Sequence, residues 1–167
     1  VIVFGCDPET AIGTQDPLLI RFSNQESVTE WAAVVTNTAG DLRVGSGSEI
    51  ICAVETRQQI LVWTDVSLHG MQYLGPPFTF GIDQLSENTT IAGPLAVKAV
   101  DDMVFWMGVE EFYIYTGQVQ KLPCSVRSYV FNDFNVSQQE MVTAGLNSSF
   151  SEIWWFYPSS SSTELDR

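Results

Sequence analysis

Basic side chains are scarce in this chain of 167 residues, which has 7 Lys and Arg against 20 Asp and Glu and a formal net charge of −13. The seven form no basic stripe, because they are scattered at positions 21, 43, 57, 98, 121, 127 and 167. Since Lys and Arg contacts to phosphate supply most of a protein's affinity for nucleic acid, this composition excludes a specific grip on DNA or RNA. An anionic membrane surface is disfavoured for the same reason.

Long apolar segments are absent as well. No uninterrupted apolar run exceeds five residues, as in Met103–Met107, whereas a membrane-spanning helix needs about 20. The apolar residues 1–5 lack a basic region before them and are shorter than the roughly 7 to 15 apolar residues of a secretion signal. We therefore expect neither a membrane anchor nor a signal peptide.

Histidine and cysteine, the usual residues of catalytic and metal sites, are few. Cys6, Cys52 and Cys124 lie 46 and 72 residues apart, which matches no zinc spacing and gives no complete disulfide framework. They are expected to be reduced and mostly buried. A triad or metal site would depend on His69, the single histidine, which lies in a predicted hairpin. The sequence thus predicts no catalytic residue, metal ligand or cofactor, and no enzyme.

Two pairs of acidic residues are candidates for a general acid and a general base. They are Asp101-Asp102 and Glu110-Glu111. Such chemistry requires that one carboxyl be buried so that its pKa rises. Because both pairs fall in predicted turns, we expect solvated carboxylates there.

Two short motifs fall short of known site signatures. Gly45–Ser48 has the wrong order for a nucleophile elbow or a phosphate loop and is predicted to be a flexible loop leading into a strand at Ile50. The stretch Ser23–Trp31 has a passing similarity to the Asp-box of sialidase propellers, but Gln25 and Ser27 stand where that box has Asp and Gly. Neither motif predicts a site.

Most apolar residues of the chain occur in short segments of four to eight residues. These segments are rich in Val, Ile, Phe, Trp and Tyr and are bounded by Gly, Pro, Asn, Asp or Ser, a pattern typical of an all-β fold. Only Ser137–Val142 has helical character, and it predicts at most one short helix. The residues expected to be largely buried include Val62, Val104, Phe105, Ile114 and Ile153.

The chain also repeats itself. Ile51–Gly75 and Leu95–Gly117 share the same order of parts: a strand, a polar turn, a Trp-bearing strand, a small turn and an aromatic strand closed by Gly. Their tryptophans, Trp63 and Trp106, lie 43 residues apart, and a third copy beginning at Met141 places its paired tryptophans 48 and 49 residues further on. Repeats of roughly 40 to 50 residues predict a β-propeller-like series of four-stranded antiparallel meanders. The alternative is a β-sandwich with accidental Trp spacing.

The repeats define four segments of one all-β domain. They are 1–45, the end of a blade plus a connection; 46–92 and 93–135, one blade-like repeat each; and 136–167, the start of a truncated blade. In the third segment the expected strands are Leu95–Val100, Met103–Val109, Glu111–Tyr115 and Val119–Phe131, the last interrupted at Pro123, with a hairpin turn at Asp101-Asp102. Because a propeller needs at least about four blades, we expect either a piece of a longer chain or a ring closed by copies.

A series of Trp- and Gly-punctuated motifs resembles the β-propeller region of tail nozzle (tail hub, DNA-stabilisation) proteins of short-tailed bacteriophages. The motifs are Arg21–Glu26 leading to Trp31, Ile60–Asp65, Met71–Phe78, Gly93-Pro94, Val104–Gly108, Phe112–Gly117, Leu122–Val126 and Glu152–Pro158. The resemblance departs at Asn24, where Asp is expected, and at Asp101-Asp102, where Gly is more usual.

The resemblance implies a non-catalytic structural protein of the virion tail, assembled in the host cytoplasm and repeated six-fold around the tail axis. Its implied partners are copies of itself and neighbouring tail or portal proteins. The acidic composition suits a conduit for DNA, because a negative wall does not bind the polyanion that passes it. The alternative function is a secreted glycan-binding or glycoside-hydrolase-type β-propeller.

Overall fold

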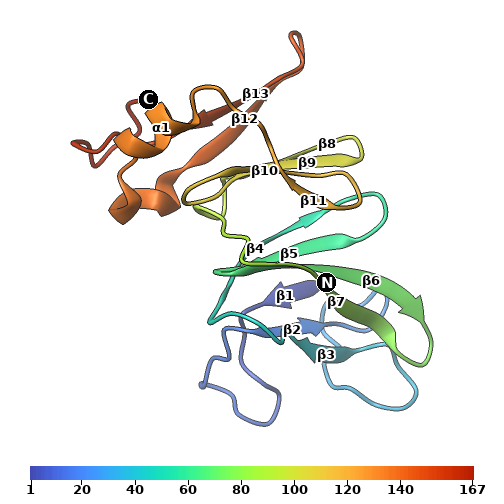
Figure 1. Cartoon of the computed structure of the whole chain (residues 1–167). Helices are drawn as coiled ribbons and strands as arrows, with labels where there is room; N and C mark the ends of the chain where they lie inside the picture. The colour runs from blue at the N-terminus through green and yellow to red at the C-terminus, as the bar shows by residue number, and fades with distance from the viewer. The chain divides into compact units, whose positions relative to one another are not determined.

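The computed structural model describes residues 1–167 and is all-β, with thirteen strands in four antiparallel sheets, one α-helix and one 3₁₀ helix (Figure 1). The chain forms two compact units, Val1–Glu87 and Asn88–Arg167. Each unit is described by itself. Neither helix has the length and apolar character needed to cross a membrane.

The first unit contains two sheets. A three-stranded sheet has the order β1 (Ile2–Phe4), β2 (Leu19–Phe22) and β3 (Gly40–Arg43). A four-stranded meander follows, with β4 (Ile50–Glu55), β5 (Ile60–Thr64), β6 (Ser67–Gly75) and β7 (Thr79–Glu87). The predicted strand at Ile50 is confirmed.

The core of this unit lies between its two sheets. Alternate residues of a strand point to one face, so Ile20 and Phe22 of β2 share a face and meet Val62 of β5 and Met71 of β6 in one buried cluster. The Phe22 ring packs edge-on against Phe80 of β7, with ring centroids 5.0 Å apart. Burying such side chains is the main stabilising contribution to this unit.

The second unit contains another four-stranded meander and a hairpin. The meander is β8 (Val97–Val100), β9 (Met103–Met107), β10 (Phe112–Tyr115) and β11 (Val119–Lys121). Helix α1 (Arg127–Asp133) and the 3₁₀ helix Val136–Met141 lead to the hairpin of β12 (Thr143–Asn147) and β13 (Glu152–Phe156). The N–H of Ala144 donates to Leu95 O at 2.8 Å, and the Trp155 indole donates to Ala96 O at 2.9 Å, so the hairpin is fastened beside β8.

The predicted repeat is visible in the placement of the tryptophans. Trp63 and Trp106 are each the fourth of five residues in the second strand of a four-stranded meander, and both are fully buried. Trp155 is likewise the fourth residue of β13, the second strand of its hairpin. The 43-residue spacing therefore reflects equivalent positions in successive sheets, as the sequence predicts.

The first hairpin turn of the second meander is also as predicted. Val100 pairs with Met103, which leaves Asp101-Asp102 as a two-residue turn. Asp101 has φ 52°, in the left-handed region that such a turn demands and that Asp tolerates better than most residues.

The prediction of a strand over Val119–Phe131 is wrong beyond Lys121, because Arg127–Asp133 is helical. Pro123 has no N–H to continue the ladder. After it, the N–H of Val130 donates to Val126 O at 3.0 Å, so these two valines lie one helical turn apart. The short helix predicted at Ser137–Val142 is a 3₁₀ helix over Val136–Met141.

The predicted core residues divide into two groups. Val62 and Val104 are fully buried, as expected. Phe105, Ile114 and Ile153 are only partly buried, less completely than Val62 and Val104. The physical reason is the alternation of strand side chains: Phe105 lies on the face of β9 opposite Val104 and Trp106.

Candidate functional site

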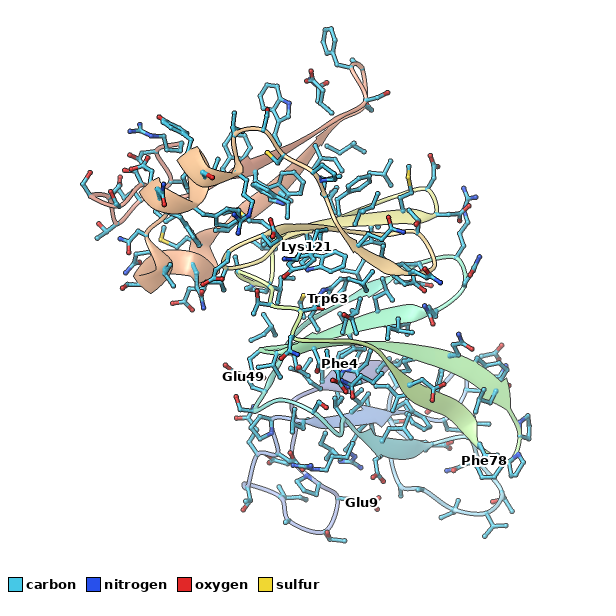
Figure 2. The ribbon with its side chains drawn as sticks, viewed as in Figure 1. Phe4, Glu9, Glu49, Trp63, Phe78 and Lys121 are labelled. Atoms are coloured by element: carbon cyan, nitrogen blue, oxygen red, sulfur yellow. The ribbon has the colours of Figure 1, made fainter.

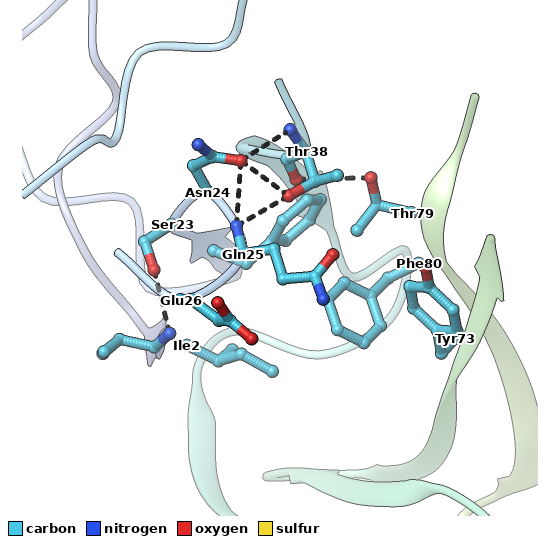
Figure 3. A pocket seen from close by; sticks show the side chains of 11 residues that line it. Ile2, Ser23, Asn24, Gln25, Glu26, Thr38, Tyr73, Thr79 and Phe80 are labelled. Carbon is cyan, nitrogen blue, oxygen red and sulfur yellow. Dashed lines mark hydrogen bonds between the residues drawn. The ribbon is translucent and has the colours of Figure 1, made fainter. Parts of the chain in front are cut away.

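The clearest hollow of the first unit is a pocket of about 400 Å³ between the loop after β2 and the β6–β7 hairpin (Figure 3). We call it the loop pocket. It is lined by Val1, Ile2, Phe22, Ser23, Asn24, Gln25, Glu26, Thr38, Tyr73, Thr79 and Phe80.

Asn24 organises the loop that forms one wall. Its Oδ1 accepts hydrogen bonds from the Gln25 N–H at 2.9 Å and from the N–H and Oγ1 of Thr38 at 3.1 and 3.0 Å (Figure 3). Across the pocket, Thr79 Oγ1 donates to Thr38 O at 3.2 Å. Glu26 and Thr79 have φ 59° and 55°, a backbone region that costs non-glycine residues free energy. The two walls are therefore held to each other by hydrogen bonds.

The groups that this pocket offers to a ligand are an amide, a carboxylate and aromatic rings. The side chains of Gln25 and Glu26 are exposed and make no hydrogen bond within the chain. The Tyr73 ring is 62% exposed and packs edge-on against Phe80, with centroids 5.7 Å apart. This combination can bind a ligand through stacking and through hydrogen bonds of both polarities.

No set of groups for nucleophilic catalysis lines the pocket. The hydroxyls of Ser23, Thr38 and Thr79 each donate a hydrogen bond to an oxygen atom of the chain. Ser23 Oγ, for example, donates to Ser27 O at 2.7 Å. The lining includes no His, Cys, Lys or Arg. The one amine in it is the N-terminus of Val1, which donates to Ser23 Oγ at 2.9 Å, so it is bound to this hydroxyl as a donor and does not act there as a base. Its arrangement suits binding.

A second hollow lies within the second unit and is almost wholly apolar. It has a volume of about 240 Å³, and we call it the apolar hollow. It is lined by Phe112, Leu122, Pro123, Cys124, Val126, Val130, Trp155 and Tyr157. The lining contains no charged residue, so it offers an apolar group a place out of water.

Glu111, which precedes the lining residue Phe112 in the sequence, is more buried than the sequence predicts. The Glu110-Glu111 pair was predicted to be solvated, and Glu110 is exposed, but the side chain of Glu111 is only 12% exposed. It accepts from Lys121 Nζ at 3.0 Å and pairs with Arg127. The hydrogen bond from Lys121, together with that from Arg127, lowers the pKa of Glu111. Glu111 is thus an ionised anchor for β11 and α1.

Asp65 similarly anchors the loop that was predicted to be flexible. Its carboxylate accepts from the N–H of Ser48 at 2.8 Å and from Ser48 Oγ at 2.7 Å. Burial alone would raise the pKa of Asp65, but these hydrogen bonds lower it. Gly47, with φ 102°, allows the approach, since a Cβ there would lie 2.6 Å from Asp65 Oδ1.

His69 lies on β6, opposite Val62 of β5, and is 3% exposed. Burial lowers its pKa. No hydrogen bond joins His69 to a carboxylate or nucleophile, and its Nδ1 has no partner.

The thiols of Cys6, Cys52 and Cys124 are free and partly buried. Burial raises the pKa of Cys52 to about 12, so this thiol stays protonated near neutral pH. No three His, Cys, Asp or Glu side chains gather closely enough to hold a metal ion.

Neither hollow is predicted from the sequence. The only local signal for the loop pocket is the polar run Ser23–Glu26 directly after an apolar strand, and this run does not match the Asp-box. For the apolar hollow, the signal is Pro123 followed by Val126 and Val130 at helical spacing, within the stretch Val119–Phe131 that the repeat predicts to be a strand.

Comparison of the sequence with protein-family models finds no match, and comparison with curated proteins finds none either. Functional conclusions for this chain therefore depend on its own residues.

Proposed function

We propose that this chain is a non-catalytic structural component of a bacteriophage tail, part of a nozzle or hub tube that conducts or retains DNA. In this proposal the meanders are blades of a β-propeller, with Trp63, Trp106 and Trp155 at equivalent positions. The partners are copies of the chain and neighbouring tail or portal proteins.

The observation that carries the proposal is an open, apolar sheet edge at β13. Ala144 of β12 directs its N–H to Leu95, away from β13, so its partner Trp155 directs its backbone N–H and C=O to the open side. Tyr157, two residues on, already uses that side: its N–H and C=O pair with Arg167 at 3.1 and 3.2 Å. Such an edge is a template for another strand.

One face of the same hairpin carries two exposed aromatic side chains. Trp154 is 51% exposed and Phe156 41%, and as alternate residues of β13 they point to the same side. Exposed aromatic side chains beside an unpaired edge are costly in an isolated monomer and are typical of surfaces that assembly covers. The chain has two complete four-stranded meanders and two smaller sheets, of three and of two strands. Sheets with fewer strands than a full meander support the same interpretation, because another strand can complete them.

The charge of the chain supports a passage for DNA more than a grip on it. With a net charge of −13, the surface repels phosphate. A gel-shift assay at low salt tests this, because basic contacts to DNA are strongest there. No shift is expected, and micromolar binding that weakens steeply with added salt would refute the charge argument.

Negative-stain electron microscopy of the purified protein tests assembly directly. The proposal predicts rings of copies around a channel, six-fold by the resemblance. Immunogold labelling of virions with antibodies against the chain is expected to mark the tail. Monomers at high protein concentration, or labelling elsewhere than the tail, would contradict the proposal.

A second candidate function is glycan binding, which the loop pocket favours. The Tyr73 ring, the Gln25 amide and the Glu26 carboxylate together suit a neutral sugar, since rings stack on its apolar face and planar polar groups bond its hydroxyls. Glycoside hydrolysis is less favoured, because it needs two carboxyl groups and Glu26 is the one carboxylate in the lining. A glycan array separates the candidates: saturable binding lost in Tyr73→Ala favours the glycan binder.

A further inference from the structure

The tip of the β6–β7 hairpin is an exposed apolar projection. The ladder between β5 and β6 ends at the pair Ile60 and Met71, whereas the ladder between β6 and β7 continues to Gly75 and Thr79. The residues beyond Met71 therefore extend past β5. Phe78 lies at the tip and is 73% exposed, and Leu74 is 60% exposed (Figure 2).

The backbone holds Phe78 in this exposed position. Its N–H donates to Gly75 O at 3.1 Å, and its C=O accepts from the Phe80 N–H at 2.6 Å. Gly75 has φ 78°, which a glycine adopts without strain. Because the turn is already ordered, little further conformational entropy is lost when Phe78 inserts into a partner.

The apolar hollow of the second unit has the size and chemistry to receive a phenyl ring. Its volume is about 240 Å³, and an apolar cavity of about 150 Å³ already accommodates benzene. The rings of Phe112 and Trp155 and the side chain of Val130 would surround a guest with apolar atoms.

The charges beside the two features are complementary. Lys121 and Arg127 directly adjoin lining residues of the hollow and share the single carboxylate of Glu111. They form a local basic spot in a unit that has 9 acidic and 4 basic residues. Beside the hairpin, Glu26 lines the same pocket as Tyr73 and has no ion-pair partner, within a unit that has 11 acidic and 3 basic residues.

We propose that Phe78 of one copy inserts into the apolar hollow of the next copy, with Glu26 facing Lys121 and Arg127 across the contact. The inference rests on the proposed function, since it requires that copies assemble. The two patches differ, so the contact is head-to-tail and generates a ring where the rotation closes. An aromatic side chain in an apolar pocket, with a polar rim, is the usual anchor of such an interface.

Paired charge variants test the anchor. Phe78→Asp is expected to weaken self-association, measured by sedimentation velocity, by about tenfold or more. Ile12→Asp is the control, because Ile12 is 86% exposed in the loop between β1 and β2 and has no part in the contact. If Phe78→Asp associates like the parent, with melting temperatures unchanged, the inference is wrong.

Photocrosslinking locates the contact. Phe78 is replaced by p-azidophenylalanine in ¹⁵N-labelled protein, which is mixed with unlabelled copies, irradiated and analysed by mass spectrometry. The expected crosslinks join labelled to unlabelled chains and fall on residues 112–130 or 155–157. Crosslinks within one copy or to other segments would overturn the inference, and Ile12, 86% exposed, is the control position. If copies assemble without these crosslinks, this inference alone fails, whereas absence of assembly refutes the proposed function as well.

Discussion

Gly93 is the position where a single methyl group should disturb the second unit most clearly. Gly93 is buried, and a Cβ built on it would lie 2.8 Å from Glu140 Cα and 2.9 Å from Glu140 O. The obstacle is backbone, so it cannot be relieved by a rotamer change. Gly93→Ala must shift either the segment before β8 or the 3₁₀ helix that carries Glu140.

The expected cost follows from overpacking. Forcing extra methyl groups into a filled site typically costs about 1 to 3 kcal/mol. For a chain of this size each kcal/mol lowers the melting temperature by about 2 to 4 °C. Gly93→Ala is therefore expected to lower it by roughly 2 to 12 °C. Urea denaturation followed by tryptophan fluorescence gives the free energy of unfolding independently.

Gly45→Ala is the matched control. A Cβ at Gly45 meets no atom within 4 Å, and its φ lies outside the left-handed region. That variant should stay within about 0.5 kcal/mol of the parent. If Gly93→Ala has the same melting temperature as Gly45→Ala, the close approach to Glu140 does not constrain the fold and the reasoning fails.

Three further changes test the core, the ion pairs and the hairpin turn. Val104→Ala should lower the free energy of unfolding by about 2 kcal/mol. Phe105 is only partly buried, so Phe105→Ala should lower it by less than the about 3 to 5 kcal/mol typical of a fully buried Phe. A loss within that range for Phe105→Ala, measured by urea titration, would contradict this. Glu111→Gln should destabilise the protein at neutral pH. Because Lys121 lowers the pKa of Glu111 in the folded state, the stabilisation is present above the unfolded pKa, about 4.3, and is lost as pH falls through the folded pKa; melting curves of parent and variant should converge in acid, and a constant gap would argue against the ion pair. Asp101→Gly should be tolerated or mildly stabilising, since φ 52° suits glycine, and a clear fall in melting temperature would contradict it.

The predictable part of the fold is the part that local patterns specify. Trp63 and Trp106 occupy equivalent strand positions because the same run of strand, turn and strand recurs around each. The two-residue turn at Asp101-Asp102 follows from turn chemistry alone. The sequence does not predict helix α1, because Val130 and Phe131 have high β propensity. Only the packing of Phe131 against Phe112, at 5.1 Å between ring centroids, shows why the helix is retained.

The candidate sites depend on contacts that the sequence does not display. The wall of the loop pocket requires Asn24 to meet Thr38, fourteen residues away, and requires left-handed backbone at Glu26 and Thr79. Glu111 finds Lys121 only because β10 and β11 pair in the register that joins Tyr113 to Lys121. Sequence patterns identify the strands, but they do not show which loops the paired strands bring together.

The sheet topology has a consequence for how the chain acquires its structure. Every ladder in the four sheets joins strands that are consecutive in the sequence. Local pairing of this kind costs little loop-closure entropy and favours rapid folding. A hairpin forms in about 1 to 10 μs, whereas a ribosome adds about 5 to 20 residues per second. Each meander can therefore be complete before the next one has been synthesised, and few unpaired strands are exposed at any moment in the crowded cell.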